Sequence, residues 1–350
     1  MSSSSSEPLP ETIRDVEQLE ELLSRPTPEV IETFGRLDGD LIVLGVGGKI
    51  GPSLARMAKR ASDAADRPRR IIGVARFSTA GLEEQLRSQG IDTVRSELLE
   101  REQLAALPDA PNVLYLAAMK FGTSGQEATT WARNVYLPGM ICERYGHSRI
   151  VAYSTGNVYP LTPVERGGSV ESDPPGPVGE YAMSCLGRER MFAYFSQMLG
   201  TPVALVRLNY ANEMRYGTLV DLAQRVMAGE PIDLRMGHFN AIWQGDNNVM
   251  TLRAFDHASS PPMVLNVTGA QTLSVRRVAE EFGRLLQKPV RFVGSESPDA
   301  LLSNASKAYG LFGRPRVSEE QLIRWVADWQ QRGGPTLNRP THFEARDGRF

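Results

Sequence analysis

The chain has 350 residues, of which 41% are hydrophobic and 23% charged, a composition typical of a globular protein with one large or two coupled domains. Its net charge of -2 and pI of about 6.2 show no excess of positive charge of the kind that binds nucleic acid or an anionic membrane. Two distant cysteines do not form a disulfide framework, and the four histidines lack metal-ligand spacing, so we expect no metal. No apolar run reaches the ~20 residues of a bilayer span, and the start lacks a signal-peptide pattern. We therefore expect a cytoplasmic protein without nucleic-acid or membrane partners.

Short apolar runs alternate with helix-forming stretches from Leu41 onward. The run LIVL at 41 predicts a first strand, and the glycine-rich segment after it leads into a helix. The next strands are predicted at 71–75, 91–96, 112–118, 149–155 and 202–208, with helices at 79–90, 127–146 and 180–199. This alternation predicts an α/β fold, a Rossmann-type doubly wound parallel sheet with helices on both faces.

After about Tyr210 the regular alternation of strands and helices ends, and we expect a smaller C-terminal lobe that binds substrate. Helices are predicted there at 217–228, 274–287, 299–310 and 318–332, and strands at 263–269 and 290–294. The predicted domain organisation has four parts, which are an N-terminal extension (1–40), a dinucleotide-binding domain (41–210), a substrate lobe with strands returning to the main sheet (211–332) and a tail (333–350) that is extended against the surface or disordered.

Three glycines at intervals of three, Gly45, Gly48 and Gly51, lie directly between the first strand and its helix. Side chains at these points would hold a diphosphate away from the amides at the helix N-terminus. We therefore predict a dinucleotide site that includes the loop residues Lys49 and Ile50. The alternative is a glycine-rich turn without a ligand.

The end of the second strand bears on the choice of cofactor. An NAD site usually has Asp or Glu there to accept the ribose hydroxyls. This chain has Ala75 followed by Arg76, and a guanidinium suits a 2′-phosphate. The sequence thus slightly favours NADP over NAD, unless Arg76 is a solvated loop charge.

Several segments together resemble the extended short-chain dehydrogenase/reductases of the NAD-dependent epimerase/dehydratase family. The resemblance covers roughly residues 41–330. It rests on the glycine interval, NVLYLAA at 112–118, Asn134, STGNVYP at 154–160, Tyr181, Arg207, Asp246, LNVTG at 265–269 and SKAYGLFG at 306–313.

The resemblance implies a mechanism of hydride transfer. Tyr181 exchanges a proton with a substrate hydroxyl, and Thr155 or its neighbour Ser154 holds the same oxygen. The lysine that the family carries four residues after the tyrosine, one helical turn away, is Cys185 here. Ala117, Ala118 and Asn134 are implied to contact the cofactor, and a homodimer through 127–146 and 180–199 is implied as well.

The missing lysine leaves three alternatives, because a phenol with a pKa near 10 is a poor base at neutral pH. In the first, another cation replaces the lysine, and Lys120 is the better candidate because Arg188 would need a long reach. A substrate with an acidic proton would need less help, and Cys185 would then be a redox-active thiol or, as we favour, a small packing residue. The third alternative is a catalytically degenerate dinucleotide-binding regulator or scaffold.

The substrate side departs from relatives that hold nucleotide-sugars. Asn240 stands where those relatives place a cation for the diphosphate, and Gln244-Gly245-Asp246 replaces their usual segment. A free sugar, a sugar acid or another polyol is therefore at least as well supported. Residues expected to line this cleft are Asn157, Asn209, Arg215 and His238. The function predicted is an NAD(P)-dependent oxidoreductase or epimerase/dehydratase acting on a carbohydrate-like substrate.

Overall fold

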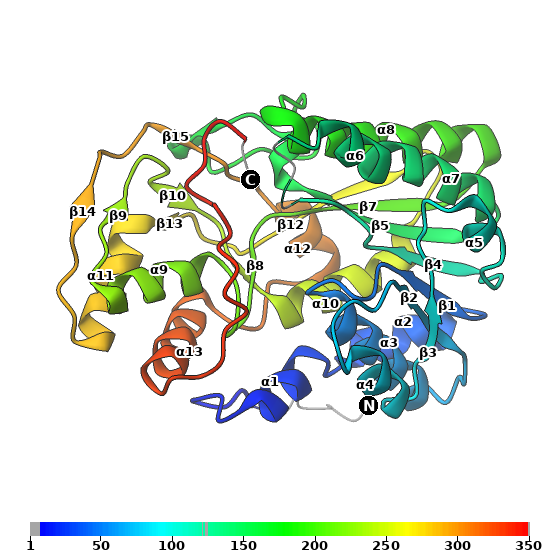
Figure 1. Cartoon of the computed structure of the whole chain (residues 1–350), viewed down its shortest axis with the longest axis horizontal. Helices are drawn as coiled ribbons and strands as arrows, with labels where there is room; N and C mark the ends of the chain where they lie inside the picture. The colour runs from blue at the N-terminus through cyan, green and yellow to red at the C-terminus, as the bar shows by residue number, and fades with distance from the viewer. Residues whose placement is uncertain (1–7, 121, 123–124, 349–350) are drawn as a thin grey trace.

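The computed structural model describes residues 8–120, 122 and 125–348. At its centre lies a seven-stranded sheet in the order β12-β7-β5-β4-β1-β2-β3, with every neighbouring pair parallel. The strand order reverses between β1 and β4, which makes the carboxyl ends of these two strands the switch point of the sheet. The predicted α/β, Rossmann-type fold is confirmed (Figure 1). The strands are β1 (Leu41–Leu44), β2 (Ile71–Ala75), β3 (Asp92–Arg95), β4 (Asn112–Tyr115), β5 (Arg149–Thr155), β7 (Val203–Leu208) and β12 (Met263–Val267).

The two faces of the sheet bury alternate residues of each strand, as a strand period of two requires. Leu41 and Val43 of β1 join one core, whereas Ile42 and Leu44 join the other. Because both faces are covered, the inner strands are largely continuous apolar runs, whereas the edge strand β3 is polar and partly exposed. Helices supplying the first core are α2 (Pro28–Arg36), α3 (Gly51–Ala64), α4 (Leu82–Ser88), α10 (Gln244–Arg253) and α12 (Ser306–Phe312), and those supplying the second are α5 (Arg101–Ala105), α7 (Leu137–Arg144) and α8 (Gly179–Leu199).

The helical stretch predicted at 127–146 consists of three pieces. These are α6 (Glu127–Trp131), a π-helical turn η1 (Ala132–Tyr136) and α7. Such π turns inside helices are frequent at functional sites, and this one contains Asn134.

The C-terminal elements form a third core around α9 (Thr218–Ala228), α11 (Val275–Leu286) and α13 (Glu319–Gln331). The predicted helix 299–310 is wrong over its first residues, because Asp299–Ala300 form strand β15 and only α12 is helical. The buried run that follows Ala300 pairs instead with the 160s loop. The short strands here are β6 (Thr162–Pro163), β8 (Ala211–Asn212), β9 (Ile232–Asp233), β10 (His238–Phe239), β11 (Ile242–Trp243), β13 (Leu273–Ser274), β14 (Phe292–Val293) and β15, and the single 3-10 turns are η2 (Gly156–Val158), η3 (Val164–Arg166) and η4 (Ala254–His257).

The N-terminal extension joins the sheet and the C-terminal elements. Its helix α1 (Val16–Leu23) lies against α3 and α10, and the side chain of Asn248 donates a hydrogen bond to the Leu23 carbonyl at 3.0 Å. On the other side, the indole of Trp325 in α13 donates to the carbonyls of Pro10 and Glu11. The extension therefore ties α10 to α13, as the blue segment between them in Figure 1 shows.

The C-terminal tail is extended and crosses the molecule (Figure 1, red). The backbone N–H and the hydroxyl of Thr341 both donate to Asp221 of α9, at 2.8 and 2.6 Å. Further along, Arg346 pairs with Asp299, and the Gly348 backbone lies against Gly179 at the start of α8. Of the two predicted states of the tail, the extended one is found for residues 333–348.

Candidate functional site

The glycine loop lies at the switch point, between β1 and α3. At Gly45, where φ is +92°, a Cβ would lie 2.7 Å from the Ala117 nitrogen. At Gly51 a Cβ would lie 2.2 Å from the Val46 carbonyl oxygen. These two glycines are therefore required by backbone packing. Gly48 is different, because it is exposed and a Cβ there would meet only the Gly45 oxygen, at 3.6 Å.

The open side of Gly48 leaves the backbone accessible just before helix α3, whose first turn has unsatisfied N–H groups. A diphosphate fits such a place, since amides and the helix dipole both favour negative charge. Ile50 occupies the position that precedes the helix, and its side chain is half-buried. The loop thus fits a dinucleotide, and its neighbour Ala117 lies in the segment that follows β4.

Lys49 extends from this loop toward the C-terminal elements. Its ammonium lies over the ring of Tyr216, with 2.8 Å between Nζ and the ring centroid. Burial lowers the pKa of Lys49 to about 7, and the charges of Lys120 and Arg339 act in the same direction. Asp221 opposes this decrease.

Arg76 follows β2, where the adenosine ribose of a dinucleotide would be expected. Its guanidinium is largely exposed and lies 3.6 Å from a carboxylate oxygen of Glu97. Arg133 lies closer to the same carboxylate, at 3.1 Å. Arg76 is therefore only loosely held and keeps its donors available to solvent.

The hydroxyls of Thr155 and Tyr181 are hydrogen-bonded at the carboxyl end of β5. Thr155 Oγ1 also accepts from the Asn157 N–H at 3.2 Å and donates to the Asn157 side-chain oxygen at 2.9 Å. Ser154, one residue earlier, points to the other face of the strand and donates to Glu189 at 2.5 Å. Of the two hydroxyls predicted, the geometry therefore places Thr155 at the tyrosine.

Tyr181 is poorly placed to act as a base in the ligand-free chain. Burial raises its pKa well above 10, and the neighbouring Cys185 acts in the same direction. Arg188 lowers the pKa of the phenol, but its guanidinium donates to the Tyr153 carbonyl at 3.0 Å and to Asn134 at 2.9 Å. The phenol is thus protonated at neutral pH.

Asn134 fixes the segment that follows β4. Its side-chain oxygen accepts from the Met119 N–H, and its amide donates to the Met119 carbonyl, both at 2.9 Å. The amide also donates to Ser184 on α8 at 2.9 Å. These bonds hold the neighbours of Met119, the exposed Ala118 and the half-buried Lys120, in a fixed place.

Lys120 interacts electrostatically with Cys185, the position of the missing lysine. Burial lowers the pKa of Lys120 to about 8. Burial likewise raises the pKa of the Cys185 thiol, and its side chain is fully buried. Lys120, on the segment after β4, is thus close enough to act electrostatically on the position of the missing lysine.

The residues predicted for substrate are only partly brought together. Asn157 joins Thr155, as described. Asn209 is buried, with its amide directed to the Leu301 carbonyl at 3.4 Å. The charge of Arg215 is balanced by Glu213 and Glu20, at 3.0 and 2.7 Å.

His238 lies elsewhere, in an open hollow of about 640 Å³ in the C-terminal part. The walls include Ser274, Arg277 and Glu296. Burial lowers the pKa of His238, which Glu296 opposes. No described contact of His238 leads to Tyr181.

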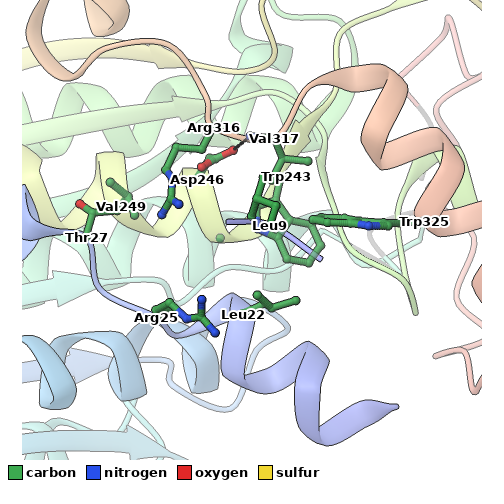
Figure 2. A pocket seen from close by; sticks show the side chains of 11 residues that line it. Leu9, Leu22, Arg25, Thr27, Trp243, Asp246, Val249, Arg316, Val317 and Trp325 are labelled. Carbon is green, nitrogen blue, oxygen red and sulfur yellow. Dashed lines mark hydrogen bonds between the residues drawn. The ribbon is translucent and has the colours of Figure 1, made fainter. Parts of the chain in front are cut away.

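A second, smaller hollow of about 30 Å³ surrounds Asp246 (Figure 2). Asp246 lies in the first turn of α10 and accepts from the Val317 N–H at 3.0 Å. Arg25 and Arg316 line the same space, with Trp243 and Trp325 on its apolar side. The volume suffices for about one water molecule rather than a substrate, so Asp246 ties α10 to the segment before α13.

Sequence reasoning missed the surroundings of Lys49 and the buried ion pair behind Ser154. Glu189 and Arg207 pair at 2.6 Å with about 7% of each side chain exposed, and Arg207 also donates to the Tyr159 hydroxyl. Asp221, which acts on Lys49, could have been noticed in the sequence, because it is an acidic residue on the buried face of an amphipathic helix.

The order of the sheet and the glycine loop between β1 and α3 are those of a dinucleotide-binding Rossmann fold. Residues 41–213, just under half of the chain, match the model of the NAD dependent epimerase/dehydratase family. The resemblance predicted from the sequence is therefore confirmed.

Solved structures of related fold cover 84% of this chain. A dTDP-glucose 4,6-dehydratase from Bacillus anthracis in complex with NAD is 17% identical, with a TM-score of 0.70 over 97% of its chain. A UDP-glucose 4-epimerase from Thermotoga maritima with UDP-glucose is 16% identical, with a TM-score of 0.68 over 99%. A UDP-glucuronic acid 4-epimerase from Bacillus cereus with UDP-glucuronic acid and NAD is 18% identical, with a TM-score of 0.69 over 99%.

At these identities the likeness establishes the fold alone. Among curated proteins, none matches the chain. Within the part of the chain that the structure describes, no helix is long and apolar enough to cross a membrane.

Proposed function

We propose that the chain is an NAD(P)-dependent enzyme that moves a hydride between a nicotinamide dinucleotide and a sugar-like or polyol substrate. The observation that carries the proposal is the Thr155–Tyr181 pair at the end of β5. Two strands away, Gly45 of the loop packs against Ala117 after the intervening β4. A dinucleotide on the loop would thus extend along the strand ends toward the tyrosine.

The proposed roles follow from the contacts. Tyr181 passes a proton to or from the substrate oxygen, and Thr155 holds that oxygen. Lys120 supplies positive charge near Cys185, which favours the ionised phenol. Asn134 acts as a positioning residue, because it fixes Met119 next to Lys120. The dinucleotide, when bound, supplies the hydride acceptor or donor.

NADP is proposed as the slightly favoured dinucleotide. The support is Arg76, a largely exposed guanidinium after β2 that a 2′-phosphate can reach without breaking a short ion pair. Two of the three solved structures above carry NAD. Titration with both dinucleotides separates the two possibilities.

A free sugar, a sugar acid or a polyol is proposed as substrate in preference to a nucleotide-sugar. Asn240 is buried, and both ends of its amide are used. The Nδ2 group donates to the Gln271 carbonyl at 3.1 Å, and the oxygen accepts from the Ser303 N–H at 3.0 Å. This position therefore offers a substrate diphosphate no positive charge and at most the one remaining N–H of a buried amide. Asn157, Asn209, Arg215 and His238 remain proposals for the substrate side, of which Asn157 has the best contacts.

A second candidate is a dinucleotide-binding regulator or scaffold. It is favoured by Cys185 in place of the lysine and by the raised pKa of Tyr181. Such a protein would bind the dinucleotide without turnover.

We also propose the domain division at 40/41, 210/211 and 332/333, a cytoplasmic location and a homodimer. The dimer is supported by large apolar side chains exposed on α6, η1 and α8. These are Trp131, Tyr136, Met183, Tyr194 and Met198. Sedimentation of the purified protein measures the oligomeric state.

The test of function begins with the purified protein. Any nucleotide released on denaturation is identified by mass spectrometry, and the emptied protein is titrated with NAD and NADP. Reduced nicotinamide is then followed with a panel of free sugars, sugar acids and nucleotide-sugars. The enzyme hypothesis expects Tyr181→Phe to abolish turnover while dinucleotide affinity is kept. If no substrate gives turnover in the wild type although a dinucleotide binds, the regulator is favoured, and if neither dinucleotide binds, both proposals fail.

A further inference from the structure

The side chain of Lys49 is the strongest feature that the proposed function leaves unexplained. The glycine loop needs only small residues and backbone N–H groups to receive a diphosphate. This loop nevertheless has a lysine between Gly48 and the first turn of α3, and the ammonium is directed to Tyr216 rather than to bulk solvent.

Tyr216 belongs to the segment after β8, which lies outside the glycine loop's own half of the sheet. Its neighbour Arg215 accepts through its carbonyl oxygen from the Leu337 N–H of the tail, at 2.9 Å. This hydrogen bond from the tail therefore holds the segment that carries the Tyr216 ring. A lysine over its face, at 2.8 Å from Nζ to the centroid, joins the loop to the C-terminal elements by a cation–π contact.

We propose that Lys49 is a side-chain ligand of the dinucleotide diphosphate, and that it exchanges the Tyr216 ring for a phosphate oxygen when the dinucleotide binds. The proposal rests on dinucleotide binding at the glycine loop and deepens it. The lysine stem begins within the loop that would receive the diphosphate, so a diphosphate bound there would lie close to this side chain. An ammonium–phosphate bond is charge-assisted and stronger than the contact with a neutral ring.

Four charged groups from other elements act on the Lys49 ammonium. Lys120 after β4 and Arg339 of the tail disfavour its charge, whereas Asp221 of α9 and Glu213 beside β8 favour it. Both acids have partners of their own, since Asp221 accepts twice from Thr341 and Glu213 pairs with Arg215. The ammonium also lies over the ring of Tyr216.

The arrangement couples dinucleotide binding to proton uptake. Burial holds the pKa of Lys49 at about 7 in the ligand-free chain, so at pH 8 most of these side chains are neutral. A bound diphosphate favours the ammonium and raises the pKa again. A proton is therefore taken up on binding, and affinity falls as pH rises, by roughly tenfold for each pH unit above about 8.

The experiment is calorimetric titration of the full-length, nucleotide-free protein with NAD and NADP between pH 6 and pH 9, in buffers of different ionisation enthalpy. Wild type is expected to take up a proton near pH 8. Lys49→Met is expected to bind roughly 10- to 100-fold more weakly at pH 6 and to take up none. Lys49→Arg, which keeps the charge at every pH, is expected to retain affinity and lose the pH dependence. Tyr216→Leu removes the competing ring and is expected to tighten binding about two- to fivefold.

Lys59→Met is the matched control, because Lys59 is a surface lysine on the same α3 helix that pairs with Asp63. It should bind like wild type. If Lys49→Met binds with wild-type affinity, or if proton uptake persists in Lys49→Met or Lys49→Arg, the inference is wrong. Thermal unfolding of each variant identifies a folding defect, in which case Lys49→Arg alone decides. Failure of the wild type to bind either dinucleotide would instead overturn the proposed function.

Discussion

Two alanine substitutions in the glycine loop separate packing from ligand binding. In Gly51→Ala the new Cβ would lie 2.2 Å from the Val46 carbonyl oxygen and 2.7 Å from the Val46 carbonyl carbon. Both are backbone atoms that cannot rotate away, so helix α3 must move from the loop. Overpacking of this kind costs typically 1–3 kcal/mol, and we expect about 3 kcal/mol here because no side chain can yield.

Gly48→Ala is the matched substitution. Its Cβ would meet only the Gly45 oxygen at 3.6 Å, an ordinary contact, and neither Gly48 nor Gly51 has a positive φ. We therefore expect a change in unfolding free energy below about 0.5 kcal/mol. The methyl group would instead project where the diphosphate approaches the backbone, and should raise the dissociation constant about tenfold or more, which is about 1.4 kcal/mol.

Urea unfolding and calorimetric titration with NAD and NADP measure the two effects separately. The reasoning predicts a crossed result, in which Gly51→Ala loses stability and Gly48→Ala loses affinity while remaining as stable as wild type. Full affinity in Gly48→Ala would refute the placement of the diphosphate on this loop. Wild-type stability in Gly51→Ala would refute the packing argument.

Three further substitutions test the interior of the site. Glu189→Gln leaves the buried guanidinium of Arg207 without its carboxylate, and should cost about 3–5 kcal/mol of unfolding free energy in urea; a loss below 1 kcal/mol would show that water reaches the pair. Burial raises the pKa of Asp246 to about 6 from 3.8, so between these values the folded chain keeps a proton that the unfolded chain releases. The free energy of unfolding of the wild type therefore falls as pH rises from about 4 to about 6, and the Asp246 carboxyl adds no further change above that range. Relative to wild type, the free energy of unfolding of Asp246→Asn should therefore rise by up to about 3 kcal/mol across that pH range, and a difference between the two proteins that does not change with pH would contradict the raised pKa. Cys185→Lys restores a cation one helical turn from Tyr181, so the alkaline pH at which turnover becomes half-maximal should move to lower pH, which an unchanged pH–rate profile would contradict.

The central sheet could be predicted because both its faces are buried. Strands covered on both sides are continuous apolar runs, and runs such as IIGVA at 71–75 are separated by helices long enough for parallel crossovers. The stretch at 127–146 was recognised as helical, but the π turn Ala132–Tyr136 was not, because a local change in hydrogen bonding leaves the apolar pattern nearly intact.

Residues 299–305 show where periodicity fails. The apolar run around Leu301 suits a buried helix and a buried extended segment equally well. What decides is tertiary pairing, since Ala300 lies opposite Thr162 in an antiparallel pair and Ser303 forms a bridge with Ser169. None of these partners is visible from the local sequence.

The candidate site likewise combines local patterns that the sequence shows with long-range contacts that it does not show. Glycine spacing, the strand-end threonine and the tyrosine are local patterns, and they could be found by inspection. The contact of Lys49 with Tyr216 joins positions far apart in the chain, and Asp221 is held by a tail residue, Thr341. The role of the N-terminal extension was equally hidden, because its carbonyls serve Trp325 and Asn248 of distant helices.

The replacement of the lysine by Cys185 has a consequence for the order of events. Lys120, which interacts electrostatically with Cys185, has a pKa lowered by burial to about 8. In the ligand-free chain at pH 8, positive charge near Tyr181 is therefore incomplete, and the phenol stays protonated. If an oxidised nicotinamide binds beside Tyr181 as proposed, its positive charge would favour the ionised phenol. A lysine one turn after the tyrosine would provide that charge permanently, whereas this arrangement makes the base conditional on the cofactor.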